Sequence, residues 1–253
     1  MSGIYSALAP IYDKWQEDVD YNSWADFFSS AFKRYFDGEV KDVLDLGCGT
    51  ASMTIALSKR SFDMIGVDSS PEMLSLARER IDEEGLSEKI LLLCQDIREF
   101  ELYGTVEATV SSLDCINHLL NTRDVKKCFS LVHNYLVPNG LFIFDVNTKY
   151  KFENIYADNS FVFEDEGAMC VWQNSYNEKN HLCDFYISLF TENKDGSYER
   201  EDEYQRERMY PISTLKRLLN ETGFETLGIF GSFNFEELKS DDERAYIIAR
   251  AIK

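Results

Sequence analysis

The feature that most constrains this chain is an apolar segment that ends in two closely spaced glycines, Val43-Leu-Asp-Leu-Gly-Cys-Gly-Thr-Ala-Ser52. The pattern predicts a buried strand over residues 40–46 that turns directly into a helix over 51–60. Gly47 and Gly49 permit a sharp turn and let a ligand approach where a Cβ would otherwise stand. A strand, a glycine turn and a helix in this order are typical of α/β folds.

The same alternation continues through most of the chain of 253 residues. Apolar runs at 64–67, 90–94, 108–112 and 141–146 predict further strands, helices are predicted at 71–84 and 122–137, and a helix at 212–222 precedes strands at 224–230 and 245–251. This order predicts a doubly wound, seven-stranded, mostly parallel sheet that ends in an antiparallel pair. Ligands of such sheets bind outside the carboxyl ends of the parallel strands.

Residues 151–209 have a different pattern, in which apolar and polar side chains alternate with period two between Cys183 and Leu189. A turn at Asn193-Lys-Asp-Gly196 follows, which is typical of a β-hairpin. We therefore predict an antiparallel β-meander inserted at 151–209, although the charged run from Glu199 to Arg208 also fits a solvated helix. The predicted core then spans 39–150 and 210–253.

Residues 1–38 are predicted to form helices rich in aromatic side chains. They could be a lid over a ligand or a cover for one face of the core. Trp15 and Trp24 could accordingly line a ligand pocket or belong to the core.

The composition excludes several classes of function. The chain has 45 acidic and 26 basic residues and a net charge of −19, which disfavours nucleic acids and anionic membranes as partners. No apolar run approaches the roughly 20 residues that span a bilayer, and the first residues do not resemble a signal peptide, so we expect a cytoplasmic protein. The six cysteines are scattered, and we predict neither a metal site nor disulfides.

Acidic residues stand at the ends of two predicted strands. Asp68 lies 19 residues after Gly49, where a carboxylate can accept two hydrogen bonds from a ribose diol, and Asp96 follows the third strand. An NAD-dependent oxidoreductase is an alternative, because Gly47-x-Gly49-x-x-Ser52 with a downstream acid is similar in outline. Asp45, Asp96 and the final antiparallel pair argue against it.

These motifs resemble those of the class I S-adenosylmethionine-dependent methyltransferases, over residues 40–147 and again over 212–252. The resemblance implies that Gly47 and Gly49 face the methionine part of the cofactor and that Asp68 holds the ribose. It also implies further cofactor-binding residues at Tyr12, Asp45, Cys48, Ser69, Met73, Asp96, Ile97 and Leu113, with Met73 against the adenine and Asp96 bonded to its amino group. The family usually has a third glycine where this chain has Ala51, which we expect to be small enough for close packing.

The resemblance extends to the small-molecule methyltransferases. The segment Tyr5-x-x-x-Ala9-x-x-Tyr12-Asp13 is similar to their opening, and the inserted meander is similar to that of sugar N-methyltransferases and glycine N-methyltransferase relatives. It implies in-line transfer of a methyl group to an amine or hydroxyl of a small molecule, by a monomer or homodimer. His118 and Tyr12 are the candidate catalytic residues, although His118 could equally be structural. Possible acceptor contacts lie at Trp172, Tyr186, Arg206 and Arg208.

Two observations favour a small molecule over a nucleic acid as the methyl acceptor. The chain has no D/N-P-P-Y motif of the kind used to methylate amino groups of bases, and reads Ser111-Ser-Leu-Asp114 at the equivalent place. No basic groove for a nucleic acid is indicated. A module that binds the cofactor without transferring a methyl group remains an alternative.

Overall fold

A seven-stranded sheet forms the core of the computed structural model, which describes residues 19–165 and 167–253. Its strands are β1 (Asp42–Leu46), β2 (Asp63–Asp68), β3 (Ile90–Cys94), β4 (Val106–Ser111), β5 (Leu136–Asn147), β10 (Phe224–Phe230) and β11 (Arg244–Ala251). They lie in the order β10-β11-β5-β4-β1-β2-β3, and β1 to β5 pair in parallel. Strand β11 is antiparallel to both neighbours. The predicted mostly parallel, doubly wound sheet is confirmed.

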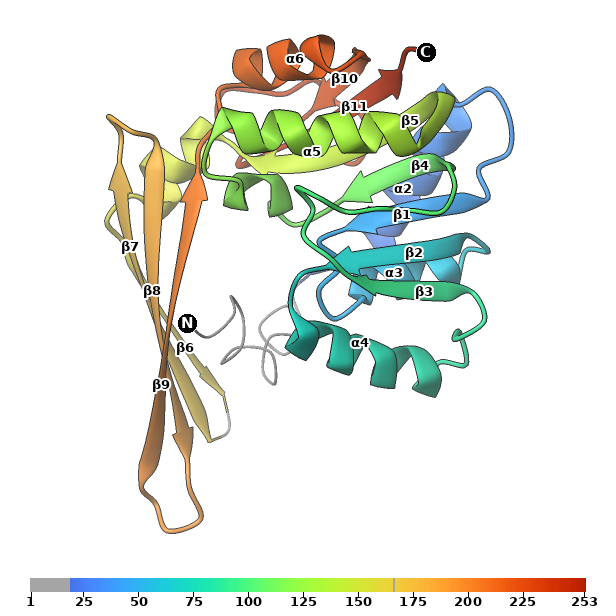
Figure 1. Cartoon of the computed structure of the whole chain (residues 1–253). Helices are drawn as coiled ribbons and strands as arrows, with labels where there is room; N and C mark the ends of the chain where they lie inside the picture. Colours follow the sequence, from blue (N-terminus) through green and yellow to red (C-terminus); the bar gives the residue numbers. More distant parts are fainter. Residues whose placement is uncertain (1–18, 166) are drawn as a thin grey trace.

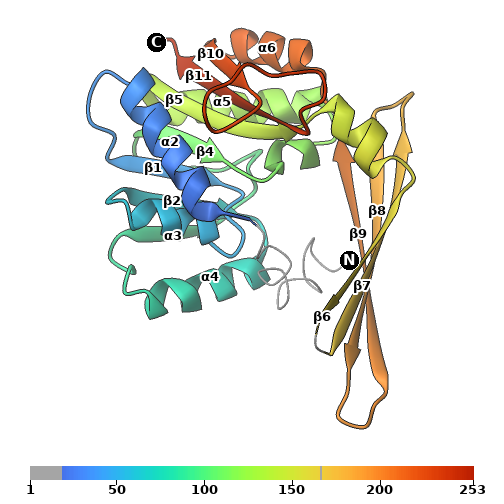
Figure 2. The same cartoon turned by 180° about the vertical axis from the view of Figure 1, so that it is seen from behind.

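Helices cover both faces of this sheet (Figures 1 and 2). They are α2 (Tyr21–Tyr35), α3 (Ser52–Ser58), α4 (Pro71–Glu83), α5 (Thr122–Tyr135) and α6 (Ile212–Glu221). Helices α2, α3 and α4 bury their apolar side chains in one cluster with side chains of the sheet, and α5 and α6 bury theirs in a second cluster on the other face. Two cores of this kind are expected where both faces of a parallel sheet are covered.

Local sequence signals explain where several helices begin. The side chain of Ser70 accepts a hydrogen bond from the backbone N–H of Met73 at 3.2 Å, with Pro71 at the first helical position of α4. One boundary was predicted wrongly. The fifth helix was expected to continue to Val137, but the extended backbone of Leu136 ends it and β5 begins there, running through Pro138.

The insertion is a four-stranded antiparallel sheet, and the predicted meander is confirmed. Its strands are β6 (Ser160–Asp165), β7 (Ala168–Asn177), β8 (Leu182–Glu192) and β9 (Tyr198–Arg208), in that spatial order. The charged run at 199–208 is therefore a strand, because β9 pairs with β8 along its whole length. Strand β6 and the π-helical turn η2 (Lys151–Tyr156) that leads into it were not predicted from the sequence. The sheet stands beside the core, on the side towards which β1, β2 and β4 point (Figure 1).

Helix α2 packs on the core through its aromatic side chains. Trp24 and Phe27 are buried and contact the rings of Phe233 and Tyr246. Trp24 is thus a core residue. Residues 1–18, with Tyr12 and Trp15, lie outside the described residues. No helix of the described part of the chain is both long and apolar enough to cross a membrane.

Candidate cofactor site

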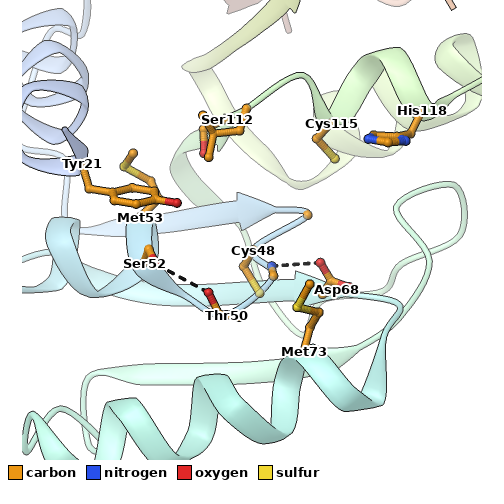
Figure 3. Close-up of a pocket in the computed structure, with 13 residues that line it drawn as sticks. Tyr21, Cys48, Thr50, Ser52, Met53, Asp68, Met73, Ser112, Cys115 and His118 are labelled. Atoms are coloured by element: carbon orange, nitrogen blue, oxygen red, sulfur yellow. Dashed lines mark hydrogen bonds between the residues drawn. The ribbon is translucent and has the colours of Figure 1, made fainter. Parts of the chain in front are cut away.

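A cavity opens at the carboxyl ends of β1, β2 and β4, as expected for a parallel sheet. Its empty volume, including space that is open to solvent, is about 620 Å³. Figure 3 shows Cys115 and His118 on one side of the cavity, with Cys48, Asp68 and Met73 on the other. The residues that line it are Tyr21, Gly47, Cys48, Gly49, Thr50, Ser52, Met53, Asp68, Met73, Ser112, Leu113, Cys115 and His118. The two glycines, His118 and seven further predicted cofactor-binding residues thus meet here or at the adjoining groove described below.

The turn after β1 needs its first glycine for two reasons. Gly47 has φ +75°, and a Cβ there would lie 2.3 Å from the Sγ of Cys115. Gly49 has φ +52°, and an added Cβ would meet no atom within 4 Å, so its backbone borders open space in the cavity. Both observations fit a turn that brings backbone atoms close to a ligand.

The backbone conformation of Ala51 was not considered in the prediction that this residue is small enough for close packing. Its φ is +65°, in the left-handed region that disfavours residues with a Cβ. The glycine that the family usually has here would adopt this conformation without strain, so the alanine fits in size but strains the backbone.

Asp68 ties the two predicted motifs together. One carboxylate oxygen accepts a hydrogen bond from the backbone N–H of Gly49 at 2.9 Å, and the other accepts one from Ser70 at 2.9 Å. Each carboxylate oxygen can accept more than one hydrogen bond, so the group retains acceptor capacity towards a ligand diol. Burial raises the pKa of Asp68 above its usual value.

Asp45 lies beneath the turn and is not among the described residues that line the cavity. It is 1% exposed, and its Oδ2 accepts a hydrogen bond from the hydroxyl of Thr54 at 2.6 Å. Burial raises the pKa of Asp45 to about 7. Its position indicates support of the turn from below.

A second groove continues past Asp68 and shares Gly47, Asp68, Cys115 and His118 with the cavity. Its lining includes three predicted residues, Ser69, Asp96 and Ile97. The carboxylate of Asp96 binds the guanidinium of Arg98, with Nε–Oδ1 at 2.9 Å, and this hydrogen bond lowers the pKa of Asp96. Cavity and groove together form one elongated site with acids at the ends of two strands and apolar side chains between them.

The contact of Arg80 of α4 with the glycine turn was not predicted from the sequence. Its guanidinium donates hydrogen bonds to the carbonyl oxygen of Thr50 at 3.1 Å and to the hydroxyl of Ser52 at 2.9 Å. It therefore braces the glycine turn from a neighbouring helix. Sequence patterns give no signal for such a contact, because the residues are about 30 positions apart.

The segment after β4 forms the opposite wall. It contains Leu113 and a short 3₁₀ helix, η1 (Cys115–His118). His118 borders both the cavity and the groove, and burial lowers its pKa. Tyr12, the other candidate catalytic residue, lies outside the described residues.

A partly buried network of charged residues joins this wall to the insertion. Asp114, His118 and Glu207 of β9 each bring one atom to within 4.8 Å of the others, close enough for a metal ion to be considered. However, Arg244 already binds Asp114 at 2.8 Å, and the ammonium of Lys151 is attracted by Asp114 and Glu207. Arg244 therefore already supplies a positive charge beside Asp114.

The four possible acceptor contacts lie apart from one another. Trp172 packs on Phe185 within the inserted sheet, and Tyr186 is 51% exposed on its outer face. Arg206 pairs with Asp184. The guanidinium of Arg208 donates a hydrogen bond to the carbonyl of Leu120 at 3.2 Å, beside the groove. The structure therefore does not bring these four together as one pocket.

The fold and the elongated site define a Rossmann-like protein that can hold an adenosine-containing cofactor across the carboxyl ends of its strands. Comparisons with known proteins identify the family to which the chain belongs. Residues 43–140 match a family model described as a methyltransferase domain.

Two curated relatives have names that agree with this match. A relative from Geobacillus sp. (strain WCH70), named as a methyltransferase, is 31% identical over 97% of this chain and 99% of its own. A glycine/sarcosine N-methyltransferase from Halorhodospira halochloris is 26% identical over 87% of this chain and 80% of its own.

Two solved structures have the same fold. An S-adenosylmethionine-dependent methyltransferase from Clostridium acetobutylicum has a TM-score of 0.88 at 31% identity, with 98% of this chain and 99% of that one covered. The sugar N-methyltransferase KedS8 from Streptoalloteichus sp. has a TM-score of 0.78 at 15% identity, covering 100% and 94%. The chain belongs to the class I S-adenosylmethionine-dependent methyltransferases. It is therefore an enzyme with S-adenosylmethionine as cofactor, and the oxidoreductase alternative is wrong.

Proposed function

We propose that this enzyme methylates an amine or hydroxyl group of a small molecule. The observation that carries the proposal is the placement of His118, which borders both parts of the cofactor site and faces the inserted sheet through Glu207. A small acceptor bound between the core and the insertion would therefore meet the methyl donor beside a titratable side chain.

The lining of the cavity and the groove supports an assignment of residues to the parts of the cofactor. Gly47, Cys48, Gly49 and Leu113 line the part next to His118, where the methionine moiety would lie. Asp68 would accept hydrogen bonds from the ribose, with Ser69 beside it and Met73 near the adenine. Asp96 and Ile97 would border the adenine in the adjoining groove. Asp45 would act indirectly, by supporting the turn.

When bound, S-adenosylmethionine supplies a methyl group on a sulfonium, which a nucleophile can take by in-line displacement. The protein's part is to orient the acceptor, and such positioning can contribute about 7–11 kcal/mol. His118 would take the proton that an amine or hydroxyl loses, because burial favours its neutral form. Tyr12 would approach the donor from the N-terminal segment, which is proposed as a lid.

An amine acceptor has some support from the relatives. The glycine/sarcosine N-methyltransferase and the sugar N-methyltransferase are both named for transfer to nitrogen. The charge of −19 also suits a cationic amine better than an anionic acceptor. A cytoplasmic location and a monomer or homodimer stay predictions.

A thermal-shift experiment tests the cofactor site. S-adenosylhomocysteine should raise the melting temperature and NAD should not. Asp68→Ala should abolish the shift, whereas Asp63→Ala, at the opposite end of the same strand, should retain it. Stabilisation by NAD alone would contradict the proposed site. Transfer of a radiolabelled methyl group into a metabolite extract then tests catalysis, and its absence despite cofactor binding would favour the non-catalytic module.

A further inference from the structure

We propose that Arg244 is a positioning residue that fixes the segment from Leu113 to His118, and with it the acceptor side of the site. The inference rests on the proposed function, which assigns the acceptor to this wall of the cavity. Arg244 begins β11, far along the chain from the segment that it would hold.

The segment needs support because its backbone is strained. Leu113 has φ +59° and Asp114 has φ +56°, and neither is a glycine. Two successive side-chain-bearing residues in the left-handed region persist only where surrounding contacts impose the conformation. Such strain is common at functional sites.

Arg244 supplies those contacts. Its guanidinium binds the carboxylate of Asp114 at 2.8 Å and also binds the carboxylate of Asp145 in β5. The same Oδ2 of Asp145 accepts a hydrogen bond from the backbone N–H of Asp114 at 3.0 Å. Asp114 is thus held by its side chain and by its backbone, with Arg244 bridging the two carboxylates. The ring of Trp24 lies 5.8 Å from the guanidinium carbon on another side.

The position of Asp114 is transmitted to the site through η1. The helix begins at Cys115, whose Sγ lies 2.3 Å from the place that a Cβ on Gly47 would take, and it ends at His118. The side chain of Asn117 is hydrogen-bonded to the backbone of Asn147 at 3.0 Å and of Arg208 at 2.8 Å. Release of Asp114 would therefore loosen one end of a segment whose other end carries the proposed base.

Arg244 is not among the described residues that line the cavity or the groove, so its action would be indirect. Its side chain is 18% exposed, and Asp145 is fully buried. Loss of the Arg244 charge by itself would raise the pKa of His118, because it leaves the carboxylate of Asp114 unpaired near the imidazole. A merely structural role would therefore lower stability but leave the proton affinity of His118 unchanged in a variant that keeps the charge. A positioning role predicts a change in that proton affinity.

The test is an NMR titration of the histidine ring protons in the wild-type chain, Arg244→Met, Arg244→Lys and Arg250→Met. The chain has three histidines, so assignment is simple. Arg250 is the matched control, because it lies on the same strand but its guanidinium donates to the carbonyl of Tyr35 at 3.0 Å. Calorimetric titration with S-adenosylhomocysteine is run on each variant.

In Arg244→Met, the pKa of His118 should rise by about one pH unit or more, because a loosened segment exposes the ring to water and because Asp114 loses its cation. Affinity for S-adenosylhomocysteine should fall by less than about tenfold, and Arg250→Met should match the wild type. An unchanged pKa of His118, or an equal change in Arg250→Met, would overturn the proposal. Arg244→Lys separates positioning from charge, since lysine keeps the charge but cannot bridge both carboxylates bidentately, and it serves alone if Arg244→Met does not fold. The pKa of His118 should rise in Arg244→Lys as well. A rise confined to Arg244→Met would be an effect of charge alone and would overturn the proposal. Failure of the wild type to bind S-adenosylhomocysteine would instead contradict the proposed function, since the titration needs no ligand.

Discussion

Replacing Asp45 by asparagine should change how the stability of this enzyme depends on pH. The carboxylate lies under the glycine turn at 1% exposure. Its Oδ2 accepts a hydrogen bond from Thr54, and its Oδ1 has no hydrogen-bond partner among the described residues. Burial disfavours the ionised form and raises the pKa of Asp45 from 3.8 to about 7.

The size of the effect follows from proton linkage. The folded protein keeps the Asp45 proton up to its raised pKa, whereas the unfolded chain releases it near the ordinary value. The folded state therefore binds more protons in this window, and the free energy of unfolding falls as the pH rises through it. One pKa unit corresponds to 1.36 kcal/mol, so the ionisation of Asp45 alone lowers the free energy of unfolding by roughly 3 kcal/mol between about pH 5 and about pH 8.

Urea unfolding followed by circular dichroism at both pH values measures this directly. Asp45→Asn should lose less stability than the wild type over the interval, by roughly 3 kcal/mol. The exposed Asp37→Asn removes the same formal charge and should change with pH as the wild type does. Parallel pH profiles for the wild type and Asp45→Asn would refute the reasoning, since they would mean that Asp45 ionises alike in the folded and unfolded states.

Two further predictions concern the turn itself. Ala51→Gly should stabilise the protein by about 1 kcal/mol, or roughly 2 to 4 °C in Tm, because it relieves a left-handed alanine; a lower Tm would contradict this. Gly47→Ala should weaken S-adenosylhomocysteine binding at least about tenfold by calorimetry, because the added Cβ would collide with the Sγ of Cys115. Gly104→Ala, where an added Cβ meets no atom within 4 Å, is the matched control and should bind like the wild type.

Local patterns were sufficient to predict the sheet and one wall of the site. Gly47, Gly49 and Asp68 stand at fixed places relative to two strands, and the carboxyl ends of parallel strands meet at one edge. In the structure the two motifs are joined directly, because the N–H of Gly49 donates a hydrogen bond to Asp68 at 2.9 Å. The alternation of apolar and polar residues also predicted the inserted sheet, because successive side chains of a strand point to opposite faces.

The contacts that brace the site could not be predicted in this way. Arg80 reaches the turn at Thr50 from another helix, and Arg244 reaches Asp114 from the last strand. Nothing in the local sequence of either arginine differs from that of a solvated surface residue. The strain at Ala51 was missed for a related reason, because a glycine-to-alanine change was judged by volume and the backbone angle was unknown.

The insertion is connected to the core by polar contacts that bear on acceptor choice. Asn147 of β5 donates a hydrogen bond to Glu207 at 3.0 Å, and Asn117 donates to the backbone of Arg208 at 2.8 Å. Burial and the charge of Asp114 raise the pKa of Glu207 well above its usual value. An acid held in this way cannot be moved without leaving buried groups unpaired, which costs more than losing an exposed contact. The end of β9 and the wall of the cavity should therefore move as one unit, so that changes of acceptor would require substitutions on both sides of this junction.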